Sequence, residues 1–294
     1  MFPTKPECRA VPALILADRK IIRVDGADAG HFLQNLITAN IDAVEPGEAR
    51  PAALLTPQGK ILFDFLISKA GETGYHCDVR ADIADDFVRR MTIYKLRAAV
   101  SIEKLDDIKV IAGWNEAPPT GALADKRFPG EAQVWRLHGG DAVADANRAA
   151  WDALRISHGV AESGADFALS DIFPHDAMMD KNGGVDFRKG CYVGQEVVSR
   201  MQHRGTARRR VAIVGSETEL PQTGPDDAAI AILAGEKPVG SLGTVVGKTG
   251  LAMVRTDRVA EALAQNIPLT AGGSPVSLAL PGWTGLSFDA APDS

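Results

Sequence analysis

Cysteine is scarce in this chain of 294 residues. The three cysteines, Cys8, Cys77 and Cys191, lie far apart and outside any Cys-x-x-Cys pair. An odd number of distant thiols argues against a disulfide framework, and it encodes no self-contained zinc or iron–sulfur ligand set. The six histidines show no ligand spacing with one another or with carboxylates. We therefore assign no metal site and expect a reducing compartment.

Long apolar runs and an excess of positive charge are also missing. The run from Val11 to Ala17 is far shorter than a bilayer requires. The first ten residues lack the charged start and long apolar centre of a secretory signal, so we expect a cytoplasmic protein with no membrane partner. A net charge of −6 argues against strong direct binding of nucleic acid.

The composition that remains, 45% hydrophobic and 24% charged, is that of a soluble chain with room for two or three cores. Before residue 115, alternating and helical apolar patterns follow each other as in a ferredoxin-like α+β unit. Strands are expected at 14–16, 21–24, 53–56, 61–68, 75–79, 100–105, 110–114 and 133–137, and helices at 29–38, 83–94 and 144–156.

After residue 206 the pattern changes to short strands separated by glycine-containing turns. This pattern predicts a small antiparallel β-barrel or sandwich, interrupted by one helix near 258–263. The strands are expected at 210–214, 229–233, 239–246 and 275–280.

The most specific motif is the run from Lys189 to Glu196, KGCYVGQE. Apolar spacing after it predicts a helix that begins near Gln195. The positive end of that helix, with Arg188 and Lys189, favours a reactive thiolate at Cys191. The alternative is an inert, buried cysteine. We predict a functional Cys191 in a loop that opens onto a cavity.

Two further charged residues stand out. Asp64 lies within the apolar strand 61–68, where an unpaired buried carboxylate is costly. Asp64 therefore either faces solvent, because side chains alternate between the two faces of a strand, or contacts a ligand. Arg97 follows the predicted helix 83–94, where its charge complements the helix dipole. The alternative for Arg97 is a clamp on an anionic ligand tail or a link to Asp64.

The one strong basic cluster follows the cysteine motif. Its ordinary interpretation is a solvated helix end and a charged entry to a strand. The alternative is an RNA or phosphate contact, but few aromatic residues are interleaved for stacking on bases. The cluster comprises Arg200, His203, Arg204, Arg208, Arg209 and Arg210.

The KGCYVGQE run, followed by Arg200 and His203-Arg204-Gly205, resembles the signature of the YgfZ family of folate-binding proteins. That family is related to the glycine-cleavage T-protein, an aminomethyltransferase. The resemblance extends over about residues 10–210 and includes FLQNL at 32–36, LLTPQGK at 54–60, YKLR at 94–97 and FPHDA at 173–177.

The resemblance implies an α+β fold of the T-protein kind, a three-part cloverleaf around a central cavity. Residues 1–48 and 115–205 would form the discontinuous folate-binding domain. Residues 49–114 would be an inserted ferredoxin-like unit, and 206–294 a C-terminal antiparallel β-barrel.

The resemblance also implies tetrahydrofolate or a related reduced folate in the cavity, with Asp64 contacting the pterin. From the residues themselves, Tyr192 suits stacking and Gln195 hydrogen bonding to such a ring, although Tyr192 equally suits a core. Glycines on both sides let the backbone approach closely. The predicted folate contacts are Asp64, Arg97, Lys189, Gly190, Tyr192, Gly194, Gln195, Glu196 and Arg200.

In function, the resemblance implies a monomeric accessory protein for iron–sulfur cluster assembly or repair, with Cys191 as its working thiol. Its partners would be folate, iron–sulfur assembly proteins and client enzymes, including tRNA-modifying ones. One alternative is a folate-dependent one-carbon transferase, in which Asp64 assists proton transfer. A second is a redox-sensing thiol protein.

Overall fold

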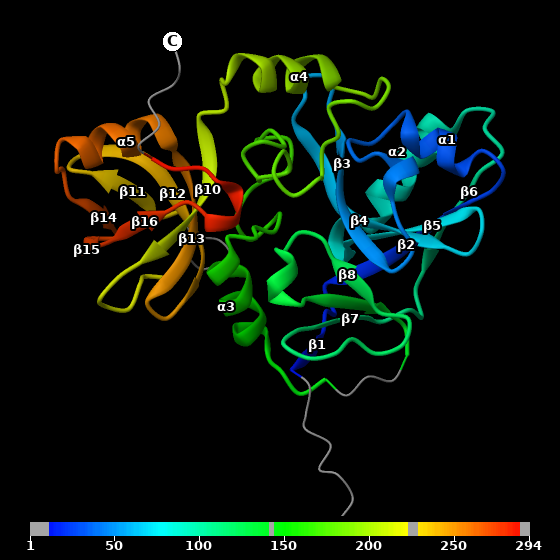
Figure 1. Cartoon of the computed structure of the whole chain (residues 1–294), viewed down its shortest axis with the longest axis horizontal. Helices are drawn as coiled ribbons and strands as arrows, with labels where there is room; N and C mark the ends of the chain where they lie inside the picture. The colour runs from blue at the N-terminus through cyan, green and yellow to red at the C-terminus, as the bar shows by residue number, and fades with distance from the viewer. Residues whose placement is uncertain (1–11, 141–143, 223–228, 289–294) are drawn as a thin grey trace, which may run out of the picture.

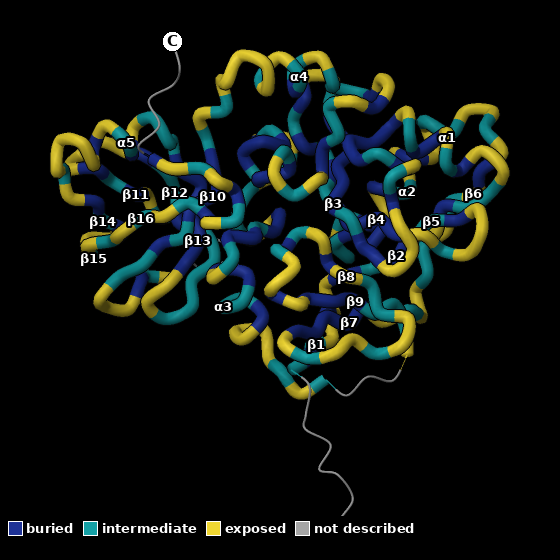
Figure 2. Tube along the Cα trace, viewed as in Figure 1, coloured by how far each residue is buried: buried dark blue, intermediate teal, exposed yellow. Residues whose placement is uncertain are grey.

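The computed structural model describes residues 12–140, 144–222 and 229–288, which form two sheets flanked by helices (Figure 1). The larger sheet has nine strands in the order β1-β7-β9-β8-β3-β4-β5-β2-β6, and the smaller has seven. The central strands of the larger sheet are mostly buried, whereas the turns between strands are exposed (Figure 2). Within the described residues, no helix is long and apolar enough to cross a membrane.

The antiparallel half of the larger sheet carries the first core. Its strands are β2 (Arg19–Asp25), β3 (Glu48–Leu55), β4 (Ile61–Ala70), β5 (Gly74–Arg80) and β6 (Ser101–Leu105). Helix α2 (Ala84–Lys95) places Phe87 against Phe63 and Phe65 of β4, with ring centroids 5.4 and 5.1 Å apart. Because side chains alternate along a strand, Asp64 is directed to the other face of β4.

The other half of the sheet contains β1 (Ala13–Ile15), β7 (Val110–Gly113), β8 (Leu123–Asp125) and β9 (Trp135–His138). Strand β8 runs parallel to β3 and so joins the two halves. The described residues also contain single 3₁₀ turns η1 (Ile41–Ala43), η2 (Ala81–Ile83), η3 (Gly130–Ala132) and η4 (Gly282–Thr284). The domain boundaries predicted from the sequence stay a prediction.

Two predicted helices are shorter than expected. Helix α1 (Ala29–Gln34) ends before Thr38, because the chain there bonds to the backbone of Ala53 in β3. Helix α3 begins at Arg148 and ends at His158, since the Asn147 side chain accepts a hydrogen bond from the Ala150 amide and caps it.

The C-terminal part is the predicted antiparallel barrel. Its strands are β10 (Arg209–Gly215), β11 (Ala231–Ala234), β12 (Lys237–Val246), β13 (Thr249–Arg255), β14 (Leu269–Ala271), β15 (Ser274–Pro275) and β16 (Ser277–Ala279). Helix α5 (Thr256–Ala264) covers it where one helix was expected. Helix α4 (Gln195–Arg204) connects the barrel to the cysteine loop and begins at the predicted residue.

A buried ion network fixes the barrel to the rest of the chain. Arg155 of α3 is fully buried and contacts Asp152, Glu162 and Asp166 at 2.8, 3.4 and 2.8 Å. Arg155 and Asp166 both bond to Thr244 of β12. Burial opposes ionisation of Glu162, but the neighbouring guanidinium groups, Arg155 foremost, hold its pKa well below its usual range.

Arg155→Met should therefore destabilise the fold by about 3–5 kcal/mol, because it leaves buried carboxylates without their cation. Arg148 supplies a matched control: it also contacts Asp152 and Glu162, but its side chain is 42% exposed. Arg148→Met should cost less than about 1 kcal/mol. Urea unfolding followed by circular dichroism measures both, and equal losses would contradict this account of the interface.

Candidate functional site

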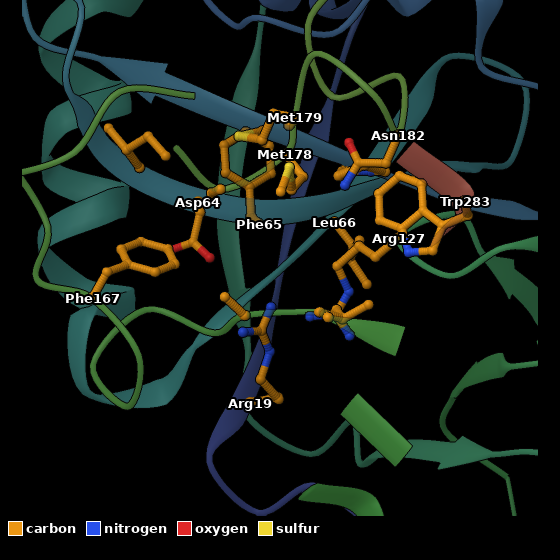
Figure 3. Close-up of a pocket in the computed structure, with 17 residues that line it drawn as sticks. Arg19, Asp64, Phe65, Leu66, Arg127, Phe167, Met178, Met179, Asn182 and Trp283 are labelled. Carbon is orange, nitrogen blue, oxygen red and sulfur yellow. The ribbon is translucent and has the colours of Figure 1, made fainter. Parts of the chain in front are cut away.

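Asp64 lies in a pocket between β4, the 159–182 segment and η4 (Figure 3). Leu66, Phe167, Met178 and Trp283 surround the same space. The Asp64 Oδ1 atom is buried and has no hydrogen-bond partner in the described structure. An unpaired carboxylate oxygen inside a protein is costly, so the pocket provides an acceptor for a ligand's N–H group.

The two cations of the pocket are already paired. Arg19 contacts the Asp78 carboxylate at 2.6 Å, and Arg127 contacts Asp125 at 2.8 Å. Burial opposes ionisation of Asp125, but Arg127 and Arg136 lower its pKa to about 2. Neither arginine is therefore free to pair with Asp64.

A reduced folate fits this pocket in chemistry but not in its present volume. The Asp64 carboxylate matches the N–H groups of a pterin, and the aromatic and methionine side chains suit a flat ring. The cavity measures about 40 Å³, whereas small-molecule sites usually enclose roughly 300–1,000 Å³. A folate would enter only after side chains such as Met178, Met179 and Trp283 move.

The cysteine loop is held by residues before it in the chain. The buried Lys189 ammonium donates hydrogen bonds of 2.7 Å to the carbonyls of both Ile37 and Ala39. The Asp186 carboxylate accepts from the amides of Arg188 and Lys189. Burial lowers the pKa of Lys189 to about 8. Lys189 thus anchors the loop and is not exposed to a ligand.

Cys191 itself is exposed and does not line the Asp64 pocket. The structure therefore does not place Asp64 and Cys191 around one cavity, contrary to the prediction. The next residue, Tyr192, turns inward to the buried cluster that holds Ile61 and Met179. Burial raises the pKa of Tyr192 to about 12. Tyr192 belongs to the core, the alternative considered for it above.

Of the two glycines in the motif, only one occupies a position where the backbone geometry requires glycine. Gly194 has φ of +80°, and a Cβ there would lie 2.5 Å from the Thr56 carbonyl oxygen. Gly190 meets nothing within 4 Å and has an ordinary φ. The LLTPQGK and KGCYVGQE motifs are therefore packed together at Gly194.

The remaining predicted contacts lie away from Asp64. Gln195 begins α4, and Glu196 forms an exposed ion pair with Arg200 one turn later. Such a pair contributes about 0.3–0.5 kcal/mol. Arg97 is exposed near Val193 and has no contact with Asp64.

The basic cluster is divided by the fold. Arg210 is buried against Asp180 at 2.6 Å, and Arg209 contacts Asp171 at 3.1 Å. This pairing supports the interpretation as a charged strand entry. Cys8 lies outside the described residues. Within the described ranges, no three histidine, cysteine, aspartate or glutamate side chains gather as metal ligands.

Sequence reasoning missed most of the residues around Asp64. Arg19 and Arg127 come from β2 and from the turn after β8, and Trp283 comes from beyond the barrel strands. Nothing in their local sequence distinguishes them from surface residues. Asp78 is different, because it lies between the apolar residues Cys77 and Val79 of β5. Its position in that strand indicates a buried charge, and Asp78 is buried.

Cys191 should react with iodoacetamide in the native protein, whereas Cys77 should react only after unfolding. Cys77 is buried, and burial raises the pKa of its thiol far above the usual range. Peptide mass spectrometry, with and without urea, measures each site separately. Modification of Cys77 at the rate of Cys191 in native conditions would contradict this assignment.

Two segments of the chain match the models of known protein domains. Residues 16–112 match the model of the GCVT N-terminal domain, and residues 208–286 match that of the CAF17 C-terminal beta-barrel domain. The fold matches the crystal structure of glycine cleavage system aminomethyltransferase T from Bartonella henselae, with a TM-score of 0.72. That match covers 93% of this chain and 86% of the other at 16% identity, so it shows the fold.

The curated relatives include proteins named iron-sulfur cluster assembly factor IBA57 or its homolog. The one from Pyricularia oryzae is 34% identical over 67% of this chain and 55% of its own length. The one from Coccidioides immitis is 32% identical, over 78% of this chain and 62% of its own length. The human protein is 27% identical, over 83% of this chain and 77% of its own length. This chain spans little more than half the length of the relatives from Chaetomium globosum and Neurospora crassa, 54% and 56% respectively.

One prediction is wrong by this comparison. These relatives are all named as mitochondrial, which overturns the expectation of a cytoplasmic protein. That expectation relied on a leader pattern missing from the first ten residues, and such an absence decides no compartment. The predicted T-protein-like fold is confirmed, and the assignment to the YgfZ family stays a prediction. The chain joins a GCVT-type N-terminal domain to a CAF17-type C-terminal barrel.

Proposed function

We propose that this protein is an iron–sulfur cluster assembly factor in which Cys191 is the working thiol. The observation that carries the proposal is an exposed cysteine in a loop fixed by buried hydrogen bonds. The names of the IBA57 relatives support the same function. A fixed, accessible thiol can ligate iron or attack a persulfide without reordering its loop.

The ligand count indicates that such a factor acts with another protein. An iron–sulfur cluster is held by four cysteine thiolates in the usual case. Of the two cysteines in the described part of the chain, Cys77 is buried and only Cys191 is accessible. The remaining ligands would come from an assembly partner, so the protein would support a cluster during assembly or transfer.

The test is complementation of cells that lack the protein. Wild type and Cys77→Ser should restore the activity of iron–sulfur enzymes, including the tRNA-modifying ones implied by the resemblance, whereas Cys191→Ser should not. Western blots verify that the variants accumulate equally. Full restoration by Cys191→Ser would refute the proposal, and sustained one-carbon transfer by the purified protein would favour the transferase alternative.

We also propose that the Asp64 pocket binds tetrahydrofolate or a related reduced folate. The buried, unpartnered Asp64 oxygen supports it, because it lacks the donor that a pterin N–H group would supply. Trp283 lines the same pocket and is a natural fluorescent reporter. The small present volume means that binding must be accompanied by movement of the lining side chains.

Asp64→Asn should weaken tetrahydrofolate binding by about 1–3 kcal/mol, as expected when a charged buried hydrogen bond is lost. Tryptophan fluorescence titration gives the affinity, and Cys191→Ser is the matched control because its side chain lies outside the pocket. Equal affinity of Asp64→Asn and wild type would refute a role for this carboxylate. Absence of any binding would refute the folate site.

A further inference from the structure

Leu96, directly after α2, combines two unfavourable features. Its backbone has φ of 45° and ψ of −107°, and its side chain is 88% exposed. A leucine with positive φ is strained by roughly 1–2 kcal/mol, and its exposure to water gives no compensating burial. Ile93, one turn earlier, is 61% exposed. These are two of the four exposed large hydrophobic residues in the described structure.

Leu96 lines an apolar groove of about 480 Å³ between α1, the end of α2 and the cysteine loop. We refer to it as the α2-end groove. Val193 forms its wall on the loop side. Cys191 is two residues away, so its Cα lies within about 7 Å of the Val193 Cα. The apolar residues of the groove are Phe32, Leu36, Tyr94, Leu96, Ala98 and Val193.

The rim of the groove is positive although the chain as a whole carries a charge of −6. Lys95 and Arg97 line it, and neither forms an ion pair with any side chain in the described structure. The nearest carboxylate on the rim, Asp28, accepts a hydrogen bond from the Ala99 amide. Unpaired cations around an apolar groove complement an acidic partner.

We propose that the α2-end groove is the docking site for a partner protein that presents an apolar segment flanked by acidic side chains. The inference rests on the proposed function, because docking there would bring the partner's cluster ligands to Cys191. Exposure at Leu96 is then a feature of a contact residue, since apolar side chains exposed beside a groove mark surfaces that become buried on binding. The concave shape favours a protein segment over a flat lipid surface.

The test measures fluorescence anisotropy of a labelled peptide with leucine and phenylalanine anchors between glutamates, and of the same peptide with lysines instead. The full-length chain should bind the acidic peptide, and 0.5 M NaCl should weaken that binding because it screens the rim charges. Leu96→Gly should bind about tenfold more weakly, and Arg97→Glu should lose the preference for the acidic peptide.

Matched variants separate docking from folding. Glycine adopts positive φ without strain, so Leu96→Gly should keep or raise the melting temperature while it loses docking. Leu263→Ser removes an exposed leucine from α5 on the barrel and should bind as wild type does.

Equal binding of both peptides, unchanged binding by Leu96→Gly, or preferred binding of anionic phospholipid vesicles would each overturn the docking site. Cys191→Ser should bind the acidic peptide like wild type. If Cys191→Ser still rescues cells, the proposed function fails while docking stands. If Leu96→Gly binds normally and Cys191→Ser fails in cells, only the docking site is refuted.

Discussion

The structure depends on a series of buried ion pairs, with alternating positive and negative side chains, that extends from the larger sheet to the barrel. Arg136 of β9 is fully buried and contacts both Asp78 of β5 and Asp125 of β8, at 2.7 and 3.0 Å. Through Arg127 and Glu162 the series continues to Arg155 and reaches β12. Each ion is acceptable in the interior only because its neighbours are in place. The relative position of sheet, α3 and barrel is therefore fixed by pairing as well as by apolar contact.

This network also creates the conditions for the Asp64 pocket. Arg19 and Arg127 line the pocket, yet their charges are satisfied by Asp78 and Asp125. Asp64 is thus the carboxylate without a partner among residues that are otherwise matched. Folded proteins rarely leave such groups unsatisfied without a functional reason. The cost at Asp64 and the strain at Leu96 are local conflicts of the kind that mark binding sites.

The Asp64 pocket and the exposed Cys191 are separate features of one scaffold. Tyr192, the residue after Cys191, is buried in the cluster that also holds Ile61 and Met179. A ligand at Asp64 can affect the loop only through packed side chains such as Met179, which touches both regions. The proposed folate binding and the proposed role of Cys191 can consequently be measured separately.

The sequence by itself determined the elements with strong local signals. The alternation of Ile61 to Ser68, the apolar spacing before Lys95 and the glycine at 194 each act through neighbouring residues, so strands, α2 and the start of α4 were predictable. The family motifs also indicated the T-protein-like fold and its barrel. Only the tertiary structure decided that Lys189 is an anchor, that Tyr192 is core and that Arg97 lies beside a groove instead of near Asp64. Those outcomes depend on contacts between segments far apart in the chain, and spacing along a sequence carries no information about which distant segments meet.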